Sequence, residues 1–290
     1  MNRSVETVVS STRVLEGGGF PVRRPFPTPE LDQVDPFLLL DHLGPTEWGP
    51  REAIGAPDHP HRGFETVTYL LAGENEHRDS GGHQGRLRPG DVQWMTAGSG
   101  VIHSEMPSPE FYEKGGMVHG FQIWINLPRE KKMIPPRYQD TSSVNIPEVL
   151  LEDSKSRVRV IAGECQGVRA VVETNTPVLY LHVMLQPGME LIQPSPTDHN
   201  TMAYLISGEG NFGDGEYSRR AVEGQLVIYS RDGNAVSFRN TKDSSLDLQL
   251  LSKRPFNEPV ARYGPFVMNT REEIFQAFSD YDEGLMGAIS

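Results

Sequence analysis

The chain has 290 residues, 37% of them hydrophobic, which is enough for one large domain or for two domains of ordinary size. Its formal net charge of −12, with no long run rich in Lys and Arg, argues against a protein built to bind a nucleic-acid backbone. Cys165 is the single cysteine, the amino terminus is polar, and no apolar run approaches about 18 residues, so we expect a soluble cytoplasmic protein without disulfides or membrane spans.

The hydrophobic pattern has a dominant period of two, which indicates β-strands. Turn residues bound these runs, and the total of 29 glycines and 23 prolines is typical of a fold with many short strands. A helix is predicted near the end of the chain, over 270–282, where Thr270 and Glu273 have the spacing of a capping box. Strands are predicted at 64–71, 118–127, 178–185, 201–206 and 225–229.

The two halves of the chain resemble each other. The run YLLAGE at 69–74 is echoed by YLISGE at 204–209, and each follows a predicted strand. A repeat of this length indicates two copies of one domain rather than a solenoid. We therefore expect a first barrel over 1–133, a Pro- and Ser-containing linker over 134–147, a second barrel over 148–260 and a carboxyl-terminal tail over 261–290.

Two short motifs in the first half carry metal-ligand residues. His59 and His61 form one, and His103 and Glu105 form the other, and the members of each pair are two positions apart. Residues two apart on a strand point to the same face, roughly 6.5 Å apart. Two such strands facing each other can direct three imidazoles and one carboxylate at one point, which suits a divalent first-row metal with open positions. The alternative is a proline-bracketed loop whose histidines bond to the backbone.

Other polar residues have weaker signals. Counting by twos from the first motif places Glu65 on the same face, where it is either a ligand or a residue that orients one, and His119 is the other candidate for that outer role. Isolated histidines are more often structural than ligating, and we read His42, His77, His83, His182 and His199 in that way. The sequence has no nucleophile elbow, phosphate-binding loop or dinucleotide-binding glycine motif.

At these motifs the sequence resembles the pirin family of the cupin superfamily. The resemblance implies an all-β protein of two jelly-roll-like cupin barrels packed face to face, with a short carboxyl-terminal helix. The runs that carry it are DPFLLLD at 35–41, HPHRGFETV at 59–67, GDVQWMTAG at 90–98, GVIHSEM at 100–106 and GPFVMNT at 264–270.

The resemblance also implies one metal ion, usually iron, in the first barrel, with His59, His61, His103 and Glu105 as ligands. In many cupins the carboxylate ligand stands where Glu65 is, but in pirins it comes from the second motif, so Glu65 is assigned to the second shell. The second half lacks the paired histidines and retains only His199 nearby, so its barrel is expected to be metal-free. The tail is expected to pack back on the first barrel.

By the same resemblance, the expected activity is that of a quercetin 2,3-dioxygenase acting on a flavonol-like substrate and O2. Glu105, with Glu65 as the alternative, is the candidate general base. Fe²⁺ is the expected ion, and Mn, Ni, Co, Cu or Zn also suit the ligands. The alternative function is a non-catalytic, redox-sensitive iron protein that binds a regulatory protein partner, and a cupin isomerase or oxalate-degrading enzyme is a third. A deep apolar pocket favours catalysis. We expect a monomer without nucleic-acid or membrane partners.

Overall fold

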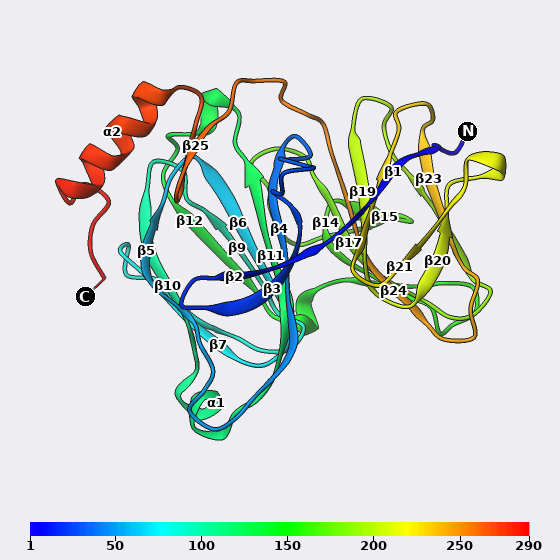
Figure 1. The fold of residues 1–290 in the computed structure, drawn as a ribbon, viewed down its shortest axis with the longest axis horizontal. Coiled ribbons are helices and arrows are strands. Elements are labelled where there is room, and N and C mark those ends of the chain that lie inside the picture. The colour runs from blue at the N-terminus through cyan, green and yellow to red at the C-terminus, as the bar shows by residue number, and fades with distance from the viewer. Residues whose placement is uncertain (290) are drawn as a thin grey trace. The chain divides into compact units, whose positions relative to one another are not determined.

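A computed structural model of the chain describes residues 1–289 and divides into two compact units. The first barrel contains Arg13–Ser143 and the chain from Phe256 onward, and the second barrel contains Met1–Thr12 and Val144–Pro255. The regular secondary structure of each unit is almost entirely strands, which pair in antiparallel sheets (Figure 1). This confirms the prediction of an all-β protein with two barrels.

The first barrel contains two antiparallel sheets. Residues of both sheets line one internal cavity, so the sheets face each other across it. The larger sheet has the strand order β12 (Arg137–Thr141), β9 (Val92–Thr96), β6 (Phe64–Ala72), β11 (Gly116–Asn126), β4 (Phe37–Trp48), β3 (Phe20–Phe26), β2 (Thr12–Glu16). The smaller sheet has the order β5 (Ala56–His61), β10 (Val101–Pro107), β7 (Asn75–Asp79), β8 (Gln84–Leu87).

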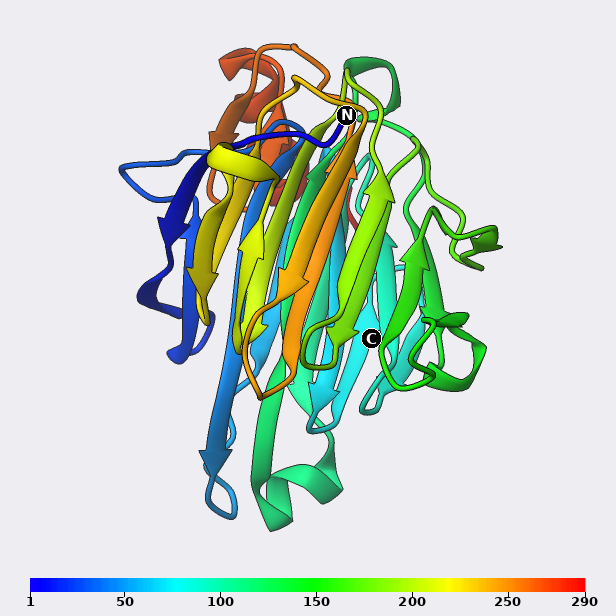
Figure 2. The ribbon, with the colours of Figure 1, turned by 90° about the vertical axis from the view of Figure 1, so that its right-hand side faces the viewer.

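The second barrel repeats this plan, and its strands, green to orange, run side by side in Figure 2. Its interior is a continuous cluster of buried side chains, in which Leu181, Leu205, Val227 and Leu248 come from neighbouring strands. The larger sheet has the order β1 (Val5–Ser10), β22 (Gln225–Tyr229), β19 (Asn200–Ser207), β24 (Leu246–Lys253), β17 (Leu179–Leu185), β14 (Arg157–Ala162), β13 (Glu148–Leu150). The smaller sheet has the order β18 (Glu190–Pro194), β23 (Ala235–Asn240), β20 (Glu209–Phe212), β21 (Arg219–Val222), and a separate ribbon contains β15 (Glu164–Cys165) and β16 (Val168–Arg169).

The carboxyl-terminal tail packs on the first barrel. It contains β25 (Ala261–Tyr263), β26 (Phe266–Met268) and α2 (Arg271–Asp282), and its apolar residues pack together with Ile102 of β10. Thr270 and Glu273 form the predicted capping box at the start of α2. Neither α-helix of the described residues has the length and hydropathy needed to cross a membrane.

One further α-helix, α1 (Pro109–Lys114), was not predicted, although it has a start signal: Ser108 caps it and proline is its first residue. Its six residues are too few to show a periodic pattern. Three short 3₁₀ helices complete the described structure: η1 (Arg129–Lys131), η2 (Ser143–Asn145) and η3 (Gly215–Tyr217).

The boundaries of the two units differ from the expected ones at both ends. The first residues, expected in the first barrel, belong to the second, because β1 pairs with β22. The expected linker over 134–147 contains β12, which pairs with β9 in the first barrel. The tail leaves the second barrel at Phe256, a few residues before the expected position.

Candidate metal centre

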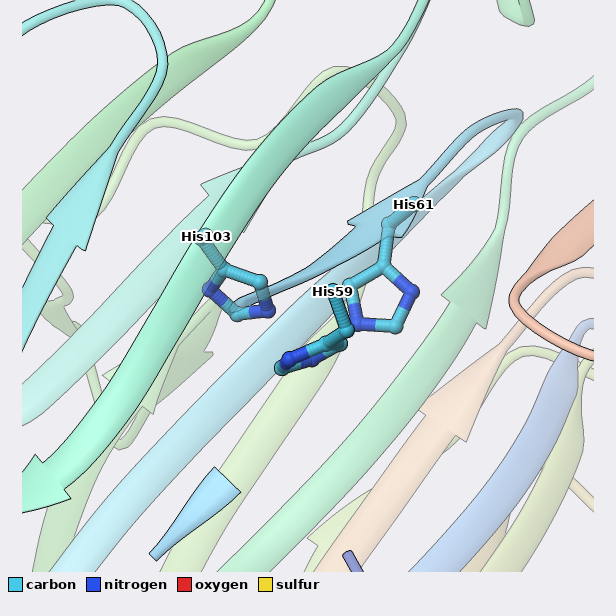
Figure 3. Close-up of side chains that lie close together, drawn as sticks. All are labelled: His59, His61 and His103. Atoms are coloured by element: carbon cyan, nitrogen blue, oxygen red, sulfur yellow. The ribbon is translucent and has the colours of Figure 1, made fainter. Parts of the chain in front are cut away.

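Three histidines converge on one point in the first barrel, and two adjacent strands supply them. His59 and His61 lie on β5, His103 lies on β10, and the antiparallel register places His103 directly opposite His59. Their ring nitrogens lie within 4.8 Å of one another, and the rings point toward a common centre (Figure 3). The three imidazoles of the predicted group converge, although the two strands are hydrogen-bonded neighbours in one sheet rather than strands that face each other.

Burial keeps two of these imidazoles neutral. His61 is 3% exposed and His103 is fully buried. Burial lowers the pKa of both side chains well below the ordinary value of histidine, and the positive charge that neighbouring imidazoles would carry lowers each pKa further. A neutral imidazole has a nitrogen lone pair available, which is the form that binds a metal ion.

Hydrogen bonds orient two of the three rings. Nδ1 of His59 lies 2.7 Å from the carbonyl oxygen of Pro57, and Nδ1 of His61 lies 3.3 Å from that of Pro265 in the tail. A carbonyl only accepts, so each Nδ1 donates and each Nε2 keeps its lone pair. The backbone bonds considered as an alternative to metal binding are thus present, and they are compatible with it.

His103 provides the sharpest test of whether a metal fits. Both of its ring nitrogens are buried without a hydrogen-bond partner. Buried polar atoms without partners are rare and call for an explanation, such as an ion. A divalent first-row ion bound by three imidazoles gives one of these two nitrogens a partner and matches the donor preference of such ions.

Glu105 lies near this group but outside it. The three residues whose ligand atoms cluster are the histidines alone, and the register between β10 and β5 shifts between His103 and Glu105. Its carboxylate oxygen Oε1 accepts a hydrogen bond of 2.8 Å from Oγ1 of Thr68, and Glu105 lines the cavity beside His59 and His61. Glu105 therefore lies in the wall of the cavity beside the histidines, where Thr68 holds it, and its carboxylate is not part of their cluster.

Glu65 does not lie where the count by twos placed it. Gly63 interrupts the strand between His61 and Phe64 with a φ of 90°, so β5 ends and β6 begins with a new alternation. Phe64 contacts the ring of His61, and Thr68 lines the cavity, so the intervening Glu65 belongs to the opposite face of β6. There its buried carboxylate accepts a hydrogen bond of 2.9 Å from Thr96.

His119 is also separate from the three histidines. Its Nε2 lies 2.7 Å from Nε2 of His42, and both rings approach Phe121. Burial is the main cause that lowers the pKa of His42 to about 3. The other isolated histidines pair mainly with acids or hydroxyls, as structural residues do: His77 with Asp140, His83 with Asp79, His182 with Asp247, and His199 with Ser252.

A cavity of about 760 Å³ opens beside the histidines. Trp124 lines it, whereas Phe64, Trp94, Met95 and Phe121 are fully buried in the packed core. Several polar residues of its wall were not singled out from the sequence, because strand pairing alone brings them together. These are Arg24, Asp41, Thr68 and Gln122.

Comparison with known proteins gives two family matches. The family model described as Pirin matches residues 19–125, and the model described as the Pirin C-terminal cupin domain matches residues 180–287. A pirin-like protein from Solanum lycopersicum is 45% identical over 272 residues, which cover 94% of this chain and 89% of that protein. A Pseudomonas aeruginosa protein, named provisionally as a quercetin 2,3-dioxygenase, is 43% identical over 277 residues and 95% of each chain.

A solved structure also matches along its whole length. The crystal structure of quercetin 2,3-dioxygenase from Acinetobacter baumannii superimposes with a TM-score of 0.90 at 36% identity, covering 100% of both chains. The sequence comparison and the structure comparison therefore both find proteins named as quercetin 2,3-dioxygenases among the relatives of this chain.

Proposed function

This chain belongs to the pirin family, and on that premise we propose that it is a metal-dependent dioxygenase that cleaves a flavonol, or a similar enol, with O2. One observation carries the proposal: three converging histidines, two of them kept neutral by burial, stand beside a cavity of about 760 Å³. That volume falls within the range of pockets that bind small molecules, which favours catalysis over a purely regulatory role. The activity named for the Acinetobacter baumannii relative supports the same reaction.

The residues that would hold the ion are His59, His61 and His103, with Glu105 proposed as the fourth ligand. Fe²⁺ is the proposed ion, and the same donors accept Mn, Ni, Co, Cu or Zn. When bound, such an ion supplies Lewis acidity toward a hydroxyl oxygen of the substrate. The carbonyls of Pro57 and Pro265 keep two of the imidazoles in the tautomer that binds through Nε2.

The remaining steps belong to side chains of the cavity. Glu105 is the proposed base that takes the hydroxyl proton of the substrate, and the hydroxyl of Thr68 holds its carboxylate in place. Trp124 and Leu39 form an apolar part of the wall that packs against flat rings and displaces water. Glu65 takes no part in this scheme, because it lies on the other face of β6.

The test is the loss of flavonol absorbance with purified, iron-loaded protein in air. We expect turnover in the wild type, and a fall of at least about a hundredfold in His59→Ala and Glu105→Gln, because each removes a group that acts on the substrate or holds the ion. Glu113→Gln is the matched control, since Glu113 pairs with Arg51 in an exposed ion pair on α1. Unchanged turnover in both site variants would refute the assignment.

The same assay separates the proposal from its alternative. A protein that binds the ion tightly but consumes no flavonol is better described as a non-catalytic, redox-sensitive iron protein with a protein partner. A monomeric state and a cytoplasmic location are part of the proposal.

A further inference from the structure

A row of three polar side chains, one from each of three neighbouring strands, lies on the face of the larger sheet that lines the cavity of the first barrel. We call this face the floor of the cavity. Thr68 of β6 stands opposite Gln122 of β11, and Gln122 stands opposite Asp41 of β4. Residues directly opposite on neighbouring strands share a face, and all three line the cavity. The three strands lie side by side in Figure 1.

On β11 and β4 the neighbouring positions on either side along the floor are apolar: Trp124 stands opposite Leu39, and Gly120 stands opposite Leu43. On β6 the residue opposite Trp124 is Thr66, which is buried. Both leucines and the tryptophan line the cavity. Polar groups in an otherwise apolar pocket are the features that fix the orientation of a ligand.

The near end of the row belongs to the candidate metal centre. Oγ1 of Thr68 lies 2.8 Å from Oε1 of Glu105 and 2.6 Å from Oε1 of Gln122. This hydroxyl, which has one hydrogen to donate, therefore lies between the site carboxylate and the middle of the row. This end is already accounted for by the proposed function.

The far end is a separate charged group. Arg24 binds Asp41 with two hydrogen bonds of 2.7 and 2.6 Å and also pairs with Glu16 at 2.6 Å. The side chain of Asp41 is 6% exposed and that of Arg24 is 12% exposed. One guanidinium faces two carboxylates, so this end does not favour a ligand that carries a carboxylate or a phosphate. An ionised carboxylate only accepts hydrogen bonds, so it selects a donor.

Backbone geometry sets the length of a ligand that spans the row. Neighbouring strands are about 4.8 Å apart, so Thr68 and Asp41, two strands apart, are separated by about 10 Å. A planar molecule of two or three rings spans that distance.

We propose that Asp41, held by Arg24, determines substrate specificity by accepting a hydrogen bond from a hydroxyl at the end of the substrate remote from the histidines. The substrate class is then a flat aromatic enol with a phenolic hydroxyl on its distal ring. The inference rests on the proposed function, because it takes the metal-binding oxygen as the other end of the molecule. Desolvation raises the pKa of Asp41 to about 6 against the effect of Arg24, which shows how strongly this carboxylate is withdrawn from water.

The competing explanation is structural. The pair between Arg24 and Asp41 joins β3 to β4 next to a break in their register. If it serves only as a link between strands, its loss lowers stability and affects all ligands alike. The experiment must therefore compare ligands within each variant.

The experiment measures equilibrium binding to metal-loaded protein without O2, using 3-hydroxyflavone and its 7-hydroxy and 4′-hydroxy derivatives. We expect the wild type to bind one of the hydroxylated derivatives about tenfold more tightly than 3-hydroxyflavone, as a hydrogen bond to a charged acceptor provides. In Asp41→Leu this preference should fall to about one, with the affinity for 3-hydroxyflavone retained. Asp41→Asn, which keeps the shape of the side chain, should show an intermediate preference.

Asp247→Asn is the matched control, because Asp247 pairs with His182 in the second barrel, and it should keep the full preference. Circular dichroism confirms that each variant is folded. A preference that is unchanged in both folded Asp41 variants overturns the inference and leaves the proposed function intact. If 3-hydroxyflavone and both derivatives fail to bind the wild type, the proposed substrate class and the inference fall together.

Discussion

The two barrels share one strand plan but differ at the place where the first holds its histidines. In the first, β5 pairs with β10 and His59 stands opposite His103; in the second, β18 pairs with β23 and Pro194 stands opposite Ala235. Pro194 precedes the repeated YLISGE run by the same number of residues as His59 precedes YLLAGE. At these matching positions the first barrel thus has two histidines that belong to the candidate metal centre, and the second has a proline and an alanine.

In the second barrel a positively charged side chain, that of Arg3, lies near the ends of β18 and β23, the strands that correspond to β5 and β10. Arg3 is fully buried, and its guanidinium donates to the carbonyl oxygens of Ser195, Pro196, His199 and Gly233. Its own backbone N–H donates to Ala235. The same strand plan therefore encloses a cavity with converging imidazoles in the first barrel and a packed core with a buried arginine in the second.

The largest expected effect is on metal content. His103→Ala removes the one ligand whose two ring nitrogens have no other partner, so the bound metal should fall from about one ion per chain to nearly none. Elemental analysis after metal loading measures this ratio. His199→Ala is the control in the second barrel, because His199 bonds to Ser252 and should not contribute. If the metal persisted in His103→Ala and disappeared in His199→Ala, the ion would belong to the second barrel and not to the first.

A smaller effect is expected from Arg3→Met. The change leaves several buried carbonyl oxygens without donors, so we expect a loss of about 3 kcal/mol from the free energy of unfolding of the second barrel. All three tryptophans lie in the first barrel, at Trp48, Trp94 and Trp124, so their emission reports on that barrel while circular dichroism reports on both. An early transition seen by circular dichroism but not by tryptophan emission is the expected signature.

The metal content of Arg3→Met should stay at about one ion per chain, since Pro194, Pro196 and Ala235 have no ligand atoms in their side chains. A second ion bound by this variant would show that the arginine alone keeps the second barrel free of metal.

The sequence was informative wherever the deciding pattern is local. His59 and His61 are two apart on one strand, and the alternation of a strand is enough to place them on one face. The capping box of α2 is likewise a local pattern, with both partners within four residues. The all-β class follows from many such short patterns.

The failures have physical causes of two kinds. Glu65 was misplaced because the positive φ of Gly63 restarts the alternation, and a count along the chain does not register a bend. Arg24 and Asp41 were missed because the pairing of β3 with β4 brings them together. The exchange of the first residues into the second barrel has the same origin, since β1 pairs with a strand more than 200 residues later. Pairing between strands that are far apart in the sequence cannot be predicted from a local pattern.

The first barrel, in contrast to the second, has its ligand strands braced by the tail. Arg62, next to His61, donates from Nε to the carbonyl oxygen of Ser99 and pairs through Nη1 with Asp280 of α2 at 2.7 Å. Its own carbonyl oxygen accepts from the N–H of Val267. One buried arginine thus joins the strand of His61, the loop before His103, and the tail. We infer that this ion pair helps to set the geometry of the imidazoles.

The smallest expected effect is therefore on metal affinity in Asp280→Asn. The change removes the charge that pairs with Arg62, next to the ligand His61. Loss of a contact that orients a metal ligand typically weakens metal binding by about tenfold. A competition titration with a chelator measures the dissociation constant, and the absorption spectrum of the Co²⁺ form reports the ligand geometry. Asp282→Asn, at an exposed position on the same helix, is the control and should behave as the wild type. An unchanged affinity and spectrum in Asp280→Asn would show that the tail holds the fold without positioning the ligands. The metal content should still saturate at about one ion per chain, because all three imidazoles are retained.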